Sequence, residues 1–174
     1  MTLFLCGMIC FAQNSGVWLD VPFIKQEKDG CGAASIAMVM QYWQAQRGAP
    51  LDSASDPSAI QSALYSSDAH GIYASAMQSY FQLHGFRTFA FEGNWQDFDR
   101  HLKQGRPLIV ALNPSVRGAA LHYVVVVGID AGQNVVIVND AAQRKLLKED
   151  RGRFEKEWRA VGNWTLLAVP TPQP

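Results

Sequence analysis

Two kinds of hydrophobic pattern divide the chain. Over residues 31–46 apolar side chains recur at helical spacing, as at Ile36, Met40 and Trp43, and this period predicts a helix that is apolar on most of its sides. Residues 121–129 instead form one long apolar run that contains a single histidine. Such a run predicts a long apolar strand.

The other predicted elements place helices mainly in the first half of the chain and strands mainly in the second. Pro57 after Asp56 is typical of a helix start, and Asn94 is a candidate cap for another helix. Helices followed by antiparallel strands indicate an α+β fold, and no repeat or boundary divides residues 13–174 into more than one domain. The predicted helices are 31–46, 57–65, 72–83, 95–103 and 150–160, and the predicted strands are 87–91, 107–112, 121–129, 134–139 and 164–169, after an extended segment at 17–24.

Composition supports a folded domain and limits its partners. Of the 174 residues, 48% are hydrophobic and 17% are charged, which fits a globular protein. Lysine and arginine total 15, as do aspartate and glutamate, so the formal net charge is zero. Because there is also no run of like charges, nucleic acid and anionic membrane surfaces are not expected as partners.

The N-terminal residues 1–12 differ from the rest of the chain. They are apolar and uncharged, and the first basic residue is Lys25. The run is too short to span a bilayer, but it has the length of a signal-peptide core, with Cys10 and Ala12 as small residues before a cleavage position. We therefore expect a signal peptide and an exported protein, periplasmic or extracellular, without an integral membrane span; a buried N-terminal strand is the alternative. Cleavage after residue 12 would leave Cys31 as the only cysteine.

Cys31 opens the predicted 31–46 helix, and this placement makes it the candidate nucleophile. The unpaired N–H groups and the positive dipole end of a helix N-terminus favour an anion, and the thiolate is the reactive form of cysteine. Small residues at 32–34 leave the first turn open to a substrate carbonyl. Gln26 lies a short loop upstream of Cys31. Its amide N–H₂ could point at an oxyanion, beside the backbone N–H of Cys31.

His122 is the candidate base, because an imidazole in so apolar a strand needs a partner or a task. A core histidine bonded to a backbone carbonyl is the other interpretation. The next strand leads into Asn139 and Asp140, and a hairpin between the two strands would bring one of them to the imidazole. Strand alternation puts Asp140 on the face of Val138 and Asn139 on the opposite face. Asp140 is therefore preferred as the residue that orients the ring, and Asn139 is the alternative.

The order of these motifs resembles the papain-like cysteine peptidases of family thirty-nine. These bacterial peptidases trim double-glycine leaders from bacteriocin precursors at ABC exporters, and the family also has stand-alone relatives. No membrane spans or ATPase follow in this sequence, so we expect a stand-alone member. The resemblance covers residues 17–170 and rests on four motifs, namely Gln26 with Cys31 and Gly32 at the entry to an apolar helix, Gly105 to Val110, His122 to Val126, and Val138 to Ala141.

The chain departs from the family pattern at three positions. Gln26 precedes Cys31 by five positions, where the pattern usually has six. Gly30 stands directly before the cysteine in place of the usual aspartate, and Ala141 follows Asp140 where a proline is common.

The resemblance implies a papain-like α+β fold in which a central helix packs on an antiparallel sheet. It also implies a thiol peptidase that acts on a peptide or protein substrate. In that assignment Cys31 is the nucleophile, His122 the general base, Asp140 the orienting residue and Gln26 the oxyanion donor.

No cofactor or metal is expected. His70, His84 and His101 are predicted in loops or on polar helix faces, and they lack the spacing of a metal site. Two other functions stay open at this point. One is a non-catalytic peptide-binding module on the same fold, and the other is a cell-wall amidase or acyltransferase.

Overall fold

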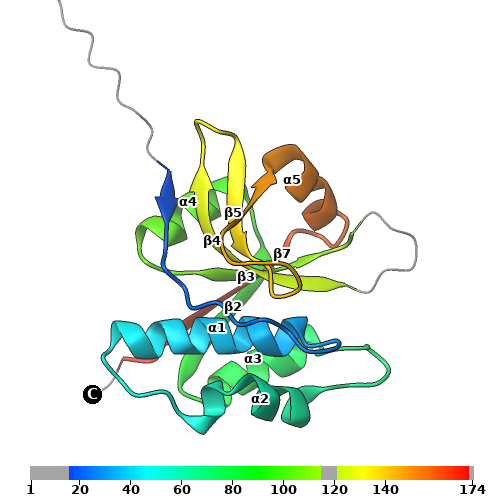
Figure 1. Ribbon diagram of the computed structural model, residues 1–174. Helices are drawn as coiled ribbons and strands as arrows, with labels where there is room; N and C mark the ends of the chain where they lie inside the picture. The colour runs from blue at the N-terminus through cyan, green and yellow to red at the C-terminus, as the bar shows by residue number, and fades with distance from the viewer. Residues whose placement is uncertain (1–15, 115–120, 173–174) are drawn as a thin grey trace, which may run out of the picture.

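Helices cover both faces of a single sheet. The computed structural model describes residues 16–114 and 121–172. Figure 1 shows α1, α2 and α3 together below the sheet, with α4 and α5 on its other side. The helices are α1 (Cys31–Gln46), α2 (Pro57–Leu64), α3 (Ala74–Leu83), α4 (Trp95–Lys103) and α5 (Arg151–Arg159), with a short 3-10 helix at Ser53–Ser55.

The sheet is antiparallel throughout, with the strand order β2-β7-β3-β4-β5-β6 and β1 added against β4. Gly128 permits the approach of β1, because a Cβ there would lie 2.7 Å from the carbonyl oxygen of Val17. The strands are β1 (Val17–Trp18), β2 (Phe86–Glu92), β3 (Leu108–Leu112), β4 (His122–Asp130), β5 (Val135–Asn139), β6 (Leu147–Asp150) and β7 (Trp164–Pro170).

Capping side chains explain why three helices begin where they do. Asp56 accepts a hydrogen bond from the backbone N–H of Ala59 at the start of α2, and Asp150 plays the same part for α5. At α4, Asn94 and Asp97 form a reciprocal capping box. Each such cap stabilises its helix by about 1 kcal/mol.

The face of the sheet toward α1 forms the first hydrophobic core. Ile36 and Met40 of α1 are fully buried with Ile109, Val125 and Val127 of the sheet. Ten of the sixteen residues of α1 are buried, because the helix also packs against α2 and α3 on its other side. The prediction of a central helix that is apolar on most sides is confirmed.

The opposite face is closed by three large aromatic side chains, Phe98 of α4 with Phe154 and Trp158 of α5, which we call the aromatic cluster. Phe98 and Trp158 are stacked with ring centroids 4.7 Å apart. All three residues are at most 2% exposed and pack with Val124 and Val126 of β4. Burial on this scale stabilises the fold by roughly 1.5–3 kcal/mol for each large side chain.

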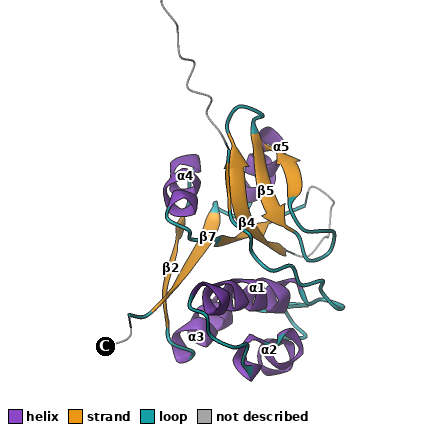
Figure 2. Cartoon of the chain, turned by 60° about the vertical axis from the view of Figure 1, so that its left-hand side comes forward, coloured by secondary structure: helices purple, strands orange, loops and turns teal. Residues whose placement is uncertain are grey.

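The long β2–β7 pair extends beyond the rest of the sheet to the helices below it (Figure 2). Phe86 at the start of β2 contacts Phe81 of α3, with ring centroids 5.4 Å apart. Trp43 of α1 donates from its indole N–H to the carbonyl oxygen of Ala168 in β7, at 3.0 Å. The two layers are therefore fixed together on the side away from Cys31.

The predicted α+β fold and most predicted elements are confirmed. The helix expected at 72–83 begins at Ala74, and strand β6 was not predicted. The prediction for His101 is wrong: it is only 9% exposed, since its ring packs beside Phe91 of β2. The predicted signal segment 1–12 lies outside the described residues. None of the helices within 16–114 and 121–172 has both the length and the apolar character needed to cross a bilayer.

Candidate active site

Cys31 is the first residue of α1 and is half-buried. The cap position before it is Gly30, which has no side chain to bond the N–H groups of the first turn, and the first turn carries no acidic residue. These N–H groups and the helix dipole therefore stay directed at the space in front of the thiol. Gly32 lets Ile72 approach this turn, because a Cβ at Gly32 would lie 3.0 Å from the Ile72 Cβ.

His122 and Asp140 are brought together by the β4–β5 hairpin. His122 is the first residue of β4, and Asp140 follows the last residue of β5. Nε2 of His122 lies 2.8 Å from Oδ1 of Asp140. Asp140 as a residue is only 4% exposed. Its carboxylate accepts two further hydrogen bonds, from the backbone N–H of Ala142 at 2.9 Å and from the Gln143 amide at 2.6 Å. These bonds fix its orientation toward the ring.

The environment of His122 favours its charged form. Burial lowers the pKa of His122, but the hydrogen bond to Asp140 and the neighbouring Cys31 sulfur outweigh burial and raise that pKa to about 10. Burial also raises the pKa of Asp140, yet its bonds to His122, Gln143 and Ala142 give a net lowering. At neutral pH the pair is therefore an imidazolium and a carboxylate, close to the thiol.

Tyr123, the residue after His122, lies on the α1 side of the sheet and is 7% exposed. Burial raises the pKa of Tyr123 to about 12, and the negative charge of a Cys31 thiolate adds to the effect. The phenol therefore stays protonated and carries no charge into the site.

Gln26 lies beside the first turn of α1. Its backbone N–H donates to the carbonyl oxygen of Ala141 at 3.0 Å, which attaches the glutamine loop to the residue after Asp140. Gln26 also lines a small cavity of about 70 Å³ together with Gly30 and Ala33. Its side-chain oxygen Oε1 is buried and has no hydrogen-bond partner among the described residues.

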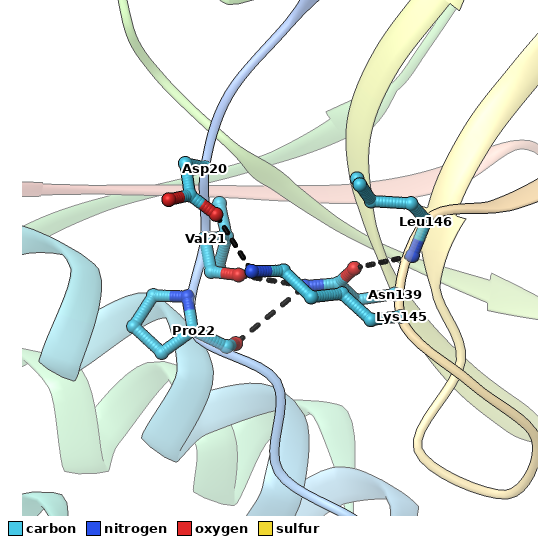
Figure 3. A network of polar contacts seen from close by, with 6 residues as sticks. All are labelled: Asp20, Val21, Pro22, Asn139, Lys145 and Leu146. Atoms are coloured by element: carbon cyan, nitrogen blue, oxygen red, sulfur yellow. Dashed lines mark hydrogen bonds and ion pairs between the residues drawn. The ribbon is translucent and has the colours of Figure 1, made fainter.

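Asn139, the alternative to Asp140 in the sequence, points to the opposite face of the strand. Its amide nitrogen donates to the carbonyl oxygens of Val21 at 3.1 Å and Pro22 at 3.5 Å, and its oxygen accepts from the Leu146 backbone N–H at 3.0 Å (Figure 3). Of the two neighbours, Asp140 is therefore the one that contacts the imidazole.

A cavity of about 140 Å³ adjoins the His122–Asp140 pair on the side of α5. Val124 and Phe154 contribute to its apolar wall, and Glu157 of α5 is among its charged residues. A cavity of roughly 150 Å³ accepts a benzene-sized molecule. The space beside the imidazole is therefore large enough for one side chain of a bound peptide.

Two contacts that build the site were not predicted from the sequence. Gln143 supports the Asp140 carboxylate, and Asn139 connects the end of β5 to the segment before the thiol. The contact of Gln143 with Asp140 has only a weak signal in the sequence, namely a polar residue three positions after an aspartate in a turn. The contact of Asn139 with Val21 has no local signal, because the two residues are 118 positions apart.

Comparisons with known proteins give one family match and several similar folds. The family model described as the Peptidase_C39 like family matches residues 18–166. No curated protein sequence matches the chain.

Three solved structures illustrate the similarity of fold. A C39-like peptidase from Bacillus anthracis is 20% identical, with 91% of this chain and 100% of that chain covered and a TM-score of 0.64. A double glycine motif protease from an AMS/PCAT transporter, in complex with the leader peptide, is 21% identical, with coverage of 89% and 95% and a TM-score of 0.68. The peptidase domain of Streptococcus ComA, a bi-functional ABC transporter of a quorum sensing pathway, is 21% identical, with coverage of 86% and 98% and a TM-score of 0.65. At these identities the structures establish the papain-like fold of C39 peptidase domains.

Proposed function

Because the chain belongs to the C39-like peptidase family, as the match over residues 18–166 shows, we propose that it is a cysteine peptidase that hydrolyses peptide bonds. The family and the fold are those of peptidases, and they are the ones that the motifs in the sequence resemble. The observation that carries the cysteine mechanism is the half-buried His122, hydrogen-bonded to the buried Asp140, next to a thiol at a helix N-terminus.

The charged pair defines the resting state of the proposed reaction. With a pKa of about 10, His122 holds its proton at neutral pH and stabilises Cys31 as the thiolate. The thiolate attacks the peptide carbonyl carbon, a C–S bond forms, and the carbonyl electrons move to oxygen. His122 then gives its proton to the amine nitrogen as the C–N bond breaks. Water, deprotonated by His122, releases the acyl group as a carboxylate and restores the thiolate.

The oxyanion formed in this reaction needs donors in front of the first turn of α1. The backbone N–H of Cys31 is one, since no capping side chain occupies the N-terminus of the helix. The side-chain amide of Gln26 is the second proposed donor, because the residue lies beside the first turn and is fixed through Ala141. A single donor of this kind contributes about 10²–10³-fold to kcat.

The proposed substrate is an extended peptide or protein segment. The cavity beside His122 and Asp140 would take one of its side chains. A related double glycine motif protease has been solved with a leader peptide bound, so peptides with a double-glycine motif are the first substrates to test. We further propose export, with residues 1–12 as the signal and 13–174 as a single peptidase domain.

The test is digestion of a peptide library that includes double-glycine peptides, analysed by mass spectrometry. Cys31→Ala should abolish hydrolysis and leave the melting temperature within a few degrees of the wild type. Full activity in this variant would refute the nucleophile assignment. If the wild-type protein binds peptides but neither cleaves them nor reacts rapidly with iodoacetamide, the chain is a binding module. Cleavage of peptidoglycan fragments instead would identify a cell-wall amidase.

A further inference from the structure

Asn139 is fully buried, with 0% of its surface exposed, and its side chain joins three separate segments. It lies at the end of β5 and bonds the carbonyls of Val21 and Pro22 and the backbone N–H of Leu146 (Figure 3). A buried carboxamide is stable only when its donors and acceptor are satisfied. All three bonds depend on the position of the backbone around it, so the side chain specifies one arrangement of these segments.

The segment that Asn139 holds leads directly to Gln26. At its start, the carbonyls of Val21 and Pro22 accept from the Asn139 amide. At its end, the backbone N–H of Gln26 donates to the carbonyl of Ala141, two residues beyond Asn139. Residues 21–26 are thus fastened at both ends to the run 139–141, and the middle residue of that run is Asp140, which contacts His122.

An exposed ion pair also joins the segment before Gln26 to the loop after β5, and it can be compared with the buried Asn139 contacts. Nζ of Lys145 lies 2.6 Å from Oδ1 of Asp20 (Figure 3). The two side chains are 40% and 75% exposed, and such surface pairs contribute little to stability. The buried carboxamide therefore holds the segment more firmly than the ion pair does.

We propose that Asn139 is a positioning residue that sets the place of Gln26 relative to Asp140 and His122, and through Gln26 the place of the oxyanion donor. The inference rests on the proposed peptidase function. Attachment of residues 21–26 to the run 139–141 at both ends gives Gln26 a fixed position.

The test is a double-mutant cycle between Asn139 and Gln26, with kcat and KM measured on a cleaved peptide. Loss of the bonds to Val21 and Pro22 should misplace the donor by a fraction of an ångström to about 1 Å, and misplacements of that size lower rates by up to about 10²-fold. Asn139→Ala should therefore lower kcat tenfold to 100-fold with KM within about threefold. In the Gln26→Ala background the same change should lower kcat less than about threefold, because the donor is already gone.

Three controls and one conservative variant separate this role from a purely structural one. Each kcat is expressed per folded molecule, with the folded fraction measured by circular dichroism, so unfolded protein does not enter the value. The pH dependence of labelling should match the wild type, since His122 and Asp140 keep their bond. Lys145→Ala, which removes only the exposed pair, should change kcat less than twofold. Asn139→Ser, which retains a hydroxyl donor, should recover part of the loss and serves if Asn139→Ala does not fold.

Two outcomes would overturn the inference while the proposed function stands. One is a wild-type kcat in the folded fraction of Asn139→Ala and Asn139→Ser. The other is full additivity of Asn139→Ala with Gln26→Ala, which would show that Asn139 does not act through Gln26. A wild-type protein that cleaves no peptide, or a Cys31→Ala variant that cleaves at the wild-type rate, would instead refute the peptidase assignment and the inference with it.

Discussion

The surroundings of Cys31 and the aromatic cluster differ in how tightly they are packed. Two glycines, Gly30 and Gly32, flank the thiol, and the Gln26 side-chain oxygen is buried with no hydrogen-bond partner in the described part of the chain. In the aromatic cluster, by contrast, the Trp158 indole is 2% exposed, stacks on Phe98 and donates to the Trp164 carbonyl at 3.1 Å.

The difference separates chemistry from stability. The aromatic cluster has large buried surfaces and satisfied polar atoms, and such regions contribute most to the free energy of unfolding. The thiol region keeps open space and charged groups that do little for stability but are suited to a reaction. Substitutions in the two regions should therefore change different measured quantities.

The largest effect is expected for His122→Ala. Without the imidazole, the Cys31 sulfur loses the positive charge that favours its nucleophilic form. We expect kcat to fall about 10⁴-fold, which corresponds to roughly 5.5 kcal/mol. Steady-state kinetics and the pH dependence of iodoacetamide labelling measure both changes. His84→Ala, at an exposed histidine on the C-cap of α3, is the matched control and should change neither.

Trp158→Ala tests the other region. It removes the central ring of the aromatic cluster and leaves Phe98 and Phe154 with an unfilled space. Changes of this kind lower the free energy of unfolding by about 3–5 kcal/mol, which urea denaturation would measure. The kcat of the folded fraction should stay within about twofold of the wild type. A large loss of kcat in fully folded protein would contradict the separation of chemistry from stability. The control is Trp18→Ala, at a 56% exposed side chain, which should change the free energy of unfolding by less than about 0.5 kcal/mol.

The same contrast explains what the sequence could predict. Hydrophobic period and capping residues are local, and they predicted α1, the three side-chain-capped helices and most of the sheet. Cys31, His122 and Asp140 could be proposed because a helix start and a hairpin place them by local geometry. Strand β6 was missed because Lys148 and the two acidic residues after it give no alternating apolar pattern, and the strand exists through its pairing with β5.

Contacts between distant parts of the chain were not predictable in this way. His101 was expected on a polar helix face, but its burial depends on Phe91 in a strand that precedes α4. The attachment of residues 21–26 to the end of β5 depends on Asn139, whose sequence position suggested an alternative partner for His122. The position of Gln26 follows from that attachment, so it became visible only in the structure.

A smaller effect is expected for the pH dependence of stability, measured as the difference between the wild type and Asp140→Asn. The pKa of His122 rises from its ordinary 6.5 to about 10 in the fold. The contribution of His122 to the free energy of unfolding is therefore complete below about pH 6.5 and is lost as the pH rises through about 10. The pKa of Asp140 is lowered, so its contribution is present above about pH 4 and is lost as the pH falls through its folded value.

The free energy of unfolding of the wild type should thus exceed that of Asp140→Asn by about 1–3 kcal/mol between about pH 4 and 6.5. This difference should shrink toward pH 10. Urea denaturation at a series of pH values provides the measurement. Asp99→Asn is the control, because Asp99 pairs with Lys103 on an exposed part of α4 and should show no such window. A difference that grows toward pH 10 would contradict the assigned direction of the His122 pKa.

The smallest change in stability is expected for Gly32→Ala, next to the thiol. Alanine favours the helix by about 1 kcal/mol over glycine, but its Cβ would lie 3.0 Å from the Ile72 Cβ. The two effects oppose each other, so the free energy of unfolding should change by less than about 1 kcal/mol. Relief of the contact must move either Ile72 or the first turn of α1, so kcat should fall several-fold.

The matched change beside the aromatic cluster is Gly93→Ala, whose Cβ would meet Thr165 Oγ1 at 2.5 Å and Trp158 Cζ2 at 2.7 Å. Overpacking of this kind costs about 1–3 kcal/mol, and here stability should fall while kcat per folded molecule is kept. If Gly32→Ala changed stability alone and Gly93→Ala changed kcat alone, the two regions would not divide chemistry and stability between them.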